Sequence, residues 1–217
     1  MQRSEEIDFR EGLVYDPKVK GFDSSFWKGD TANMGFDTVG NTIRIGDTGL
    51  AGGMSSYSQF LYGDFEFTMR GDTLSPDSND SEKLWGLMNT GDTLRRGASF
   101  FQAAYDTNTD TLVTRQLWAT HVDEWGNRQR KRITWDISWD TALTRYRITW
   151  ESDNLQFLIN DTIYATLGDK PDSSNATFQI NSQIPQALRL SNRSIDTSDT
   201  QPTRLQLLTI RNARKVI

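Results

Sequence analysis

The sequence feature that most restricts the possible folds is a run of three short alternating segments between residues 144 and 167. Apolar and polar residues alternate from Tyr146 to Trp150 and again from Leu155 to Ile159, which is the period of a β-strand with one face in water. Residues 152–154 and 160–161 (Ser-Asp-Asn and Asn-Asp) separate the segments and favour tight turns. We therefore predict a three-stranded meander, and a second sheet must cover its apolar face.

The remainder of the chain also reads as short strands joined by polar corners, without a helical period. The expected strands cover residues 41–45, 55–62, 64–70, 83–88, 98–105, 111–120, 127–135, 144–150, 155–159, 163–167, 177–184, 186–192 and 203–212. We expect 55–62 to pair with 64–70 around Gly63, and 111–120 to form a hairpin with 127–135. The pattern predicts an all-β protein, a two-sheet antiparallel jelly-roll sandwich.

Length and composition limit the domain organisation and the partners. The 217 residues suffice for one large core, so we expect a single domain over residues 21–217, preceded by an arm or edge strand over residues 1–20. A net charge of −5 leaves no broad basic field, so neither nucleic acid nor an anionic membrane surface is an expected partner. The absence of cysteine excludes disulfides and thiolate chemistry.

Targeting signals are also not expected. The first residues, MQRSEEIDFREG, are charged and contain no apolar core, so they do not read as a signal peptide. No apolar run reaches the length of about 18 residues that a membrane span requires.

Three segments carry a family resemblance. Residues 62–70 (YGDFEFTMR) are similar to the pattern YG-x-F-E-x-x-(M/I)-(K/R), and residues 85–88 (WGLM) take the place of an FWLL strand. In both motifs the chain resembles the laminarinase-like glycoside hydrolases of family 16. Residues 146–161 resemble a meander shared with the wider concanavalin A-like lectin/glucanase superfamily. The resemblance implies a concanavalin A-like jelly roll whose concave sheet holds the ligand.

The same resemblance argues against the family's reaction. Those hydrolases carry E-x-D-x-x-E on the strand after FWLL, because cleavage needs two carboxylates, about 5–5.5 Å apart in a retaining enzyme. The corresponding residues here are 98–105, ASFFQAAY, which include no acid. The family's catalytic residues therefore have no counterparts on this strand, and we expect a non-catalytic module.

Five residues are candidate glycan contacts on the concave sheet that the resemblance implies: Trp85, Gln102, Arg115, Trp118 and Trp125. Indole rings stack on the apolar faces of sugars, while amide and guanidinium groups bond their hydroxyls. The alternative for Trp85 and Trp118 is a place in the core, which is the commoner position of a strand tryptophan. Trp125 lies in a polar connection, where a contact role and a purely structural one are both open.

Metal or cofactor binding is not expected. His121 is the only histidine, zinc needs three or four N or S ligands, and we expect this residue on the surface of a loop. Asp106, Asn108 and Asp110 alternate as calcium ligands do, but the remaining signature of such a loop is missing, which favours a turn. Residues 128–132 (RQRKR) are the single basic run, read as a solvated strand face that could meet an acidic partner.

Two functions remain open at this stage. The first is a non-catalytic module that binds glycan or neighbouring protein subunits, as a cell-surface component or a virion component such as a capsid decoration, tail or fibre, with a homo-oligomer as one form. The second is a polysaccharide hydrolase or lyase with displaced acids, either Glu66 with Asp106 or Tyr105 with His121.

Overall fold

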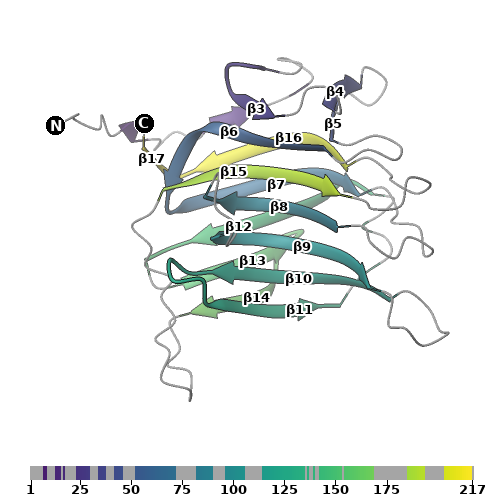
Figure 1. Ribbon diagram of the computed structural model, residues 1–217, viewed down its shortest axis with the longest axis vertical. Helices are drawn as coiled ribbons and strands as arrows, with labels where there is room; N and C mark the ends of the chain where they lie inside the picture. The colour runs from purple at the N-terminus through teal and green to yellow at the C-terminus, as the bar shows by residue number, and fades with distance from the viewer. Residues whose placement is uncertain are drawn as a thin grey trace.

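The protein is a sandwich of two antiparallel β-sheets (Figure 1). The computed structural model describes residues 7–8, 13–15, 17, 23–29, 34–37, 42–45, 52–71, 82–89, 96–105, 114–134, 136, 139, 142–152, 154–168, 185–193 and 203–216. Within these residues, no helix is long and apolar enough to cross a membrane. The predicted all-β, two-sheet architecture is confirmed.

Among the described residues, one sheet, here called the front sheet, has nine strands. Its order is β1 (Ile7–Asp8), β17 (Arg214–Val216), β6 (Gly52–Leu61), β15 (Gln186–Arg193), β8 (Glu82–Met88), β9 (Gly97–Tyr105), β10 (Thr114–Val122) and β11 (Arg128–Ile133), with β3 (Trp27–Gly29) also paired to β6.

The other sheet, the back sheet, has eight strands in the part of the chain that the structure describes. Its order is β14 (Thr162–Gly168), β13 (Asn154–Ile159), β12 (Thr144–Trp150), β7 (Gly63–Gly71), β16 (Thr203–Arg211), β5 (Thr42–Ile45) and β4 (Met34–Asp37), with β2 (Leu13–Tyr15) also paired to β16. The predicted meander is strands β12 to β14, and the hairpin predicted around residues 121–126 is β10 with β11.

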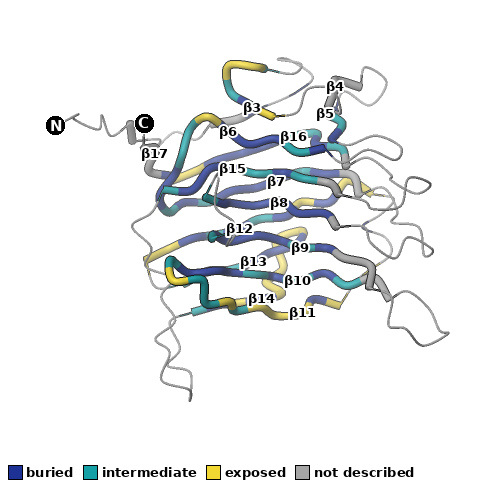
Figure 2. The backbone as a smooth tube through the Cα atoms, viewed as in Figure 1, coloured by how far each residue is buried: buried dark blue, intermediate teal, exposed yellow. Residues whose placement is uncertain are grey.

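Aromatic side chains join the two sheets. Trp85 and Phe100 of the front sheet stack with ring centroids 5.9 Å apart, and Tyr146 of the back sheet meets them edge-on at 4.9 and 5.3 Å. Phe157 adds a further edge contact with Phe100 at 5.2 Å. Such pairs contribute beyond the burial of apolar area. The apolar face of the meander is therefore covered as its pattern requires, and Figure 2 shows buried residues along the central strands.

The expected pairing of 55–62 with 64–70 is wrong. β6 belongs to the front sheet and β7 to the back sheet, so the chain changes sheets at Tyr62-Gly63 instead of forming a hairpin. Both residues have positive φ, 53° and 125°. A Cβ on Gly63 would lie 2.6 Å from atoms of Ala213, so glycine allows a close approach as well as an unusual backbone angle.

The sequence pattern does not delimit the shortest strands, β1, β2, β3, β4 and β17. In the predicted arm, Ile7 is paired with Lys215 and Leu13 with Ile210, which places both short segments at sheet positions. The expected strand 177–184 lies outside the described residues. The division into an arm and one domain stays a prediction.

Candidate functional site

The face of the front sheet that points away from the back sheet is here called the front face. Cross-strand partners point to the same side of a sheet. Ala119 is paired with Phe100, and both belong to the core. The next positions on the same strands, Thr120 and Ser99, are paired with each other and therefore point to the front face.

This alternation assigns the remaining side chains of strands β8 to β11. The described front-face residues are Leu84, Gly86, Met88, Ser99, Phe101, Gln116, Trp118, Thr120, Val122, Arg128, Arg130 and Arg132. They comprise apolar, hydroxyl, amide and guanidinium groups. Strands β9, β10 and β11 contain no Asp or Glu at any position, and β8 contains one acid, Glu82, at its first position. The central strands thus supply no pair of carboxylates.

The edge of the front face carries a tryptophan and a row of arginines. Arg130 lies over the ring of Trp118, with its guanidinium carbon 5.4 Å from the ring centroid. Arg132 is paired with Trp118 across the strands, and Arg128 with Val122. All three arginines are exposed, while Trp118 is half-buried. Guanidinium groups that stack on indole in this way are held in place while their N–H groups still face solvent.

The structure separates the five predicted glycan contacts. Trp85 has 3% of its surface exposed and packs in the core, and Gln102 points to the same side as Phe100 and is buried. Arg115 lies on β10 and is paired with Ala104 of β9. Its side chain is outside the part of the chain that the structure describes. Trp118 is on the front face. For Trp85 the core alternative applies, because an enclosed ring presents no free face to a sugar.

Trp125 occupies the turn between β10 and β11 and is 56% exposed. Asp123 organises this turn: its carboxylate accepts hydrogen bonds from the backbone N–H groups of Trp125 (3.0 Å) and Asn127 (2.8 Å). The Asn127 side-chain amide donates to the other oxygen of Asp123 at 2.9 Å. Gly126 adopts a φ of 89°. The segment Asp-Glu-Trp-Gly-Asn thus carries its own signal for this turn, in the Asp side chain that bonds the backbone and in the glycine.

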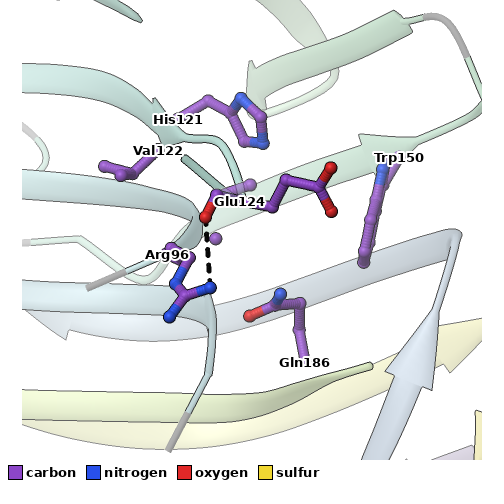
Figure 3. Close-up of a pocket in the computed structure, with 8 residues that line it drawn as sticks. Arg96, His121, Val122, Glu124, Trp150 and Gln186 are labelled. Atoms are coloured by element: carbon purple, nitrogen blue, oxygen red, sulfur yellow. Dashed lines mark hydrogen bonds between the residues drawn. The ribbon is translucent and has the colours of Figure 1, made fainter. Parts of the chain in front are cut away.

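His121 lies at the end of β10 and points between the sheets, beside a small cavity (Figure 3). Only 3% of its surface is exposed, so its predicted position on the surface of a loop is wrong. Burial lowers the pKa of His121 from 6.5 to about 4, and the nearby charge of Asp123 opposes this shift. His121 is therefore neutral at pH 7. Arg96, which lines the same cavity, donates a hydrogen bond to the backbone oxygen of Glu124 at 3.1 Å.

The alternative pair of Tyr105 and His121 does not assemble. Tyr105 is paired with Thr114, whereas His121 is paired with Ala98, seven positions along the same strand. At about 3.3 Å per residue these positions are roughly 23 Å apart.

Glu66 is on the back sheet, between the core residues Phe65 and Phe67, and therefore points away from the interior on the far side of the molecule. Its proposed partner Asp106 lies outside the described residues, as do Asn108 and Asp110. Within the described ranges, no three His, Cys, Asp or Glu side chains are grouped as metal ligands would be.

Fold and site together define a class: a jelly-roll sandwich with no carboxylate pair on the central strands of its front sheet. Solved structures share this fold. A β-glucanase of Bacillus licheniformis is 11% identical, with a TM-score of 0.63 over 92% of this chain and 97% of that chain. The laminarinase catalytic domain of Thermotoga maritima is 11% identical, with a TM-score of 0.64 over 96% and 98%.

A third similar structure is the Crh5 transglycosylase in complex with NAG, 14% identical, with a TM-score of 0.64 over 97% of this chain and 88% of that chain. No protein-family model matches the chain, and no curated protein matches it. At these identities the likeness establishes the fold alone. The concanavalin A-like jelly roll inferred from the strand motifs is confirmed.

Proposed function

We propose that this protein is a non-catalytic jelly-roll module that binds a glycan on its front face. The observation that carries the proposal is a glucanase-like fold whose central strand β9, Gly97–Tyr105, contains no carboxylate. Glycoside cleavage in this geometry needs an acid and a second carboxylate that acts as nucleophile or base. A scaffold that keeps the binding face and lacks this pair binds without cleaving.

The chemistry of the front face supports binding. Trp118 and Phe101 are paired across β10 and β9, and Ser99 and Thr120 are the next such pair on the same face. Aromatic rings offer apolar contact to sugar rings, and hydroxyl groups exchange hydrogen bonds with sugar hydroxyls. The structurally similar proteins are named as glucanases, a laminarinase and a transglycosylase bound to NAG. The proposal takes from them the class of ligand and not the reaction.

Affinity electrophoresis in gels that contain soluble polysaccharides tests the binding, with reducing-end release measured in parallel. We expect at least one polysaccharide to retard the protein without product release. Trp118→Ala should weaken this binding at least about fivefold, equivalent to about 1 kcal/mol. Tyr164→Ala is the matched control, because Tyr164 is an exposed aromatic residue on the back sheet. If the wild-type protein released sugar products and Glu82→Gln abolished that release, the non-catalytic assignment would be contradicted.

The finer form of the proposal places the module in a larger assembly, such as a virion or a cell-surface structure. The apolar side chain of Ile163 is 52% exposed on β14, the edge strand of the back sheet. Exposed apolar groups on a sheet edge support contact with a neighbouring subunit. Native mass measurement over a range of concentrations tests this: we expect oligomers that Ile163→Lys dissociates, and a monomer at every concentration would contradict the assembly role.

A further inference from the structure

Strand β11 presents three arginines on one face. Arg128, Arg130 and Arg132 alternate with Gln129 and Lys131, and the register pairs the arginines with the front-face residues Val122, Thr120 and Trp118. Alternate residues on a strand lie about 7 Å apart. The three arginine side chains therefore leave β11 at regular intervals on one face, and β11 is the last strand in the front-sheet order of the described residues.

The positive charge of this row is locally concentrated. The protein as a whole has a net charge of −5, whereas β11 contains four positive residues among six and no acid. In the part of the chain that the structure describes, no carboxylate forms an ion pair with Arg128, Arg130 or Arg132. Like charges at neighbouring same-face positions repel one another, so the row destabilises the free protein slightly.

Protection of a sheet edge explains only part of this arrangement. Charged side chains, lysine above all, keep edge strands from pairing with other chains, and any distribution of charge serves that purpose. The row differs in two respects: all three guanidinium groups share the face of the proposed glycan site, and Arg130 is held over the ring of Trp118 at 5.4 Å. Arginine offers a planar pair of donors that matches carboxylate and sulfate oxygens.

We propose that the glycan bound by the front face is a polyanion, with carboxylate or sulfate groups that the arginine row binds. This inference rests on the proposed glycan-binding function and names its ligand class. A glycan is favoured over a nucleic acid because the fold is shared with a solved β-glucanase and with a transglycosylase bound to NAG, on which the proposed function already rests.

Isothermal titration with dextran sulfate and with unsubstituted dextran tests the proposal, because the two polymers share one backbone and differ in their sulfate groups. Polygalacturonate provides the carboxylate form, and a neutral mixed-linkage β-glucan provides an uncharged ligand of another backbone. We expect binding of both polyanions and none of dextran. The affinity should fall with rising salt concentration, and the combined Arg128→Gln, Arg130→Gln and Arg132→Gln variant should bind at least about tenfold more weakly.

Lys131→Gln is the matched control for Arg130→Gln. It removes the same charge from the neighbouring position, whose side chain points to the other side of the strand, where its partner is Ala119. Arg130→Gln should reduce the slope of log affinity against log salt by about 1, and Lys131→Gln should leave it unchanged. Arg130→Lys should restore the slope but not the full affinity, because lysine lacks the planar donor pair. Circular dichroism of each variant checks the fold.

The outcomes separate the two proposals. Binding of the neutral glucan with no preference for the polyanions would overturn the inference and leave the glycan-binding function standing. No binding of any glycan would overturn both. Tighter binding of a single-stranded oligonucleotide than of either polyanionic glycan would overturn the inference in favour of a nucleic-acid ligand. Equal losses in Lys131→Gln and Arg130→Gln would also overturn it, because they would show nonspecific charge attraction.

Discussion

At the scale of single residues, the burial of His121 has a measurable consequence for stability. Its pKa is lowered from 6.5 to about 4, so between these values the unfolded chain binds a proton that the folded protein does not. Stability therefore falls as the pH falls through this interval, and the contribution is fully present above pH 6.5.

We expect the titration of His121 to lower the free energy of unfolding by about 3 kcal/mol between pH 6.5 and pH 4, because its pKa falls by roughly 2.5 on folding. Urea unfolding at a series of pH values measures it. His121→Gln serves as the reference, because it removes the titration while the carboxylates of the protein titrate as before. Parallel pH profiles of the two proteins would contradict the expectation.

Gly63 is the second residue whose effect on stability can be tested. Its φ of 125° and the 2.6 Å distance between an ideal Cβ position and Ala213 both oppose a side chain. Gly63→Ala should cost about 2 kcal/mol or more. Gly53→Ala is the control, since the nearest atom to its Cβ position is at 3.4 Å, an ordinary contact. Thermal unfolding of both variants measures the difference, and equal losses would contradict the strain at the sheet crossing.

At the scale of elements, the two faces of the front sheet give the same residue type different roles. Trp85 points into the core and Trp118 to the front face. We expect Trp85→Ala to reduce the free energy of unfolding by about 3–5 kcal/mol. Trp118→Ala should cost about 1 kcal/mol and change ligand binding instead. Chemical denaturation measures both, and similar losses of stability would contradict the assignment of faces.

Strands are easier to predict from this sequence than their partners are. The meander is recognisable because alternation and turn residues coincide in β12 to β14. Alternation alone does not state which strands pair, so it does not reveal the change of sheet at Gly63. Alternation also does not show which side of a strand faces the core when both sides are apolar, as in β8. For this reason the sequence pattern does not distinguish the core position of Trp85 from the front-face position of Trp118. The predicted loop position of His121 is wrong because β10 continues to Val122, two residues beyond the predicted end.

At the scale of the whole molecule, the aromatic cluster of Trp85, Phe100, Tyr146 and Phe157 makes each sheet depend on the other. We therefore expect the sheets to unfold together. Far-UV circular dichroism, which reports strands, and tryptophan fluorescence, which reports the core, should give coincident transitions. Two separated transitions would contradict the predicted single domain over residues 21–217.

The strand order of the front sheet has a practical consequence. Strands β1 and β17 are adjacent at one border of the sheet, and β11 forms the opposite border (Figure 1). A tag or fusion partner attached beyond either short strand would hold the molecule by the side remote from its arginines. Immobilised copies would then present their basic border outward, which suits this scaffold to oriented display on a sensor surface.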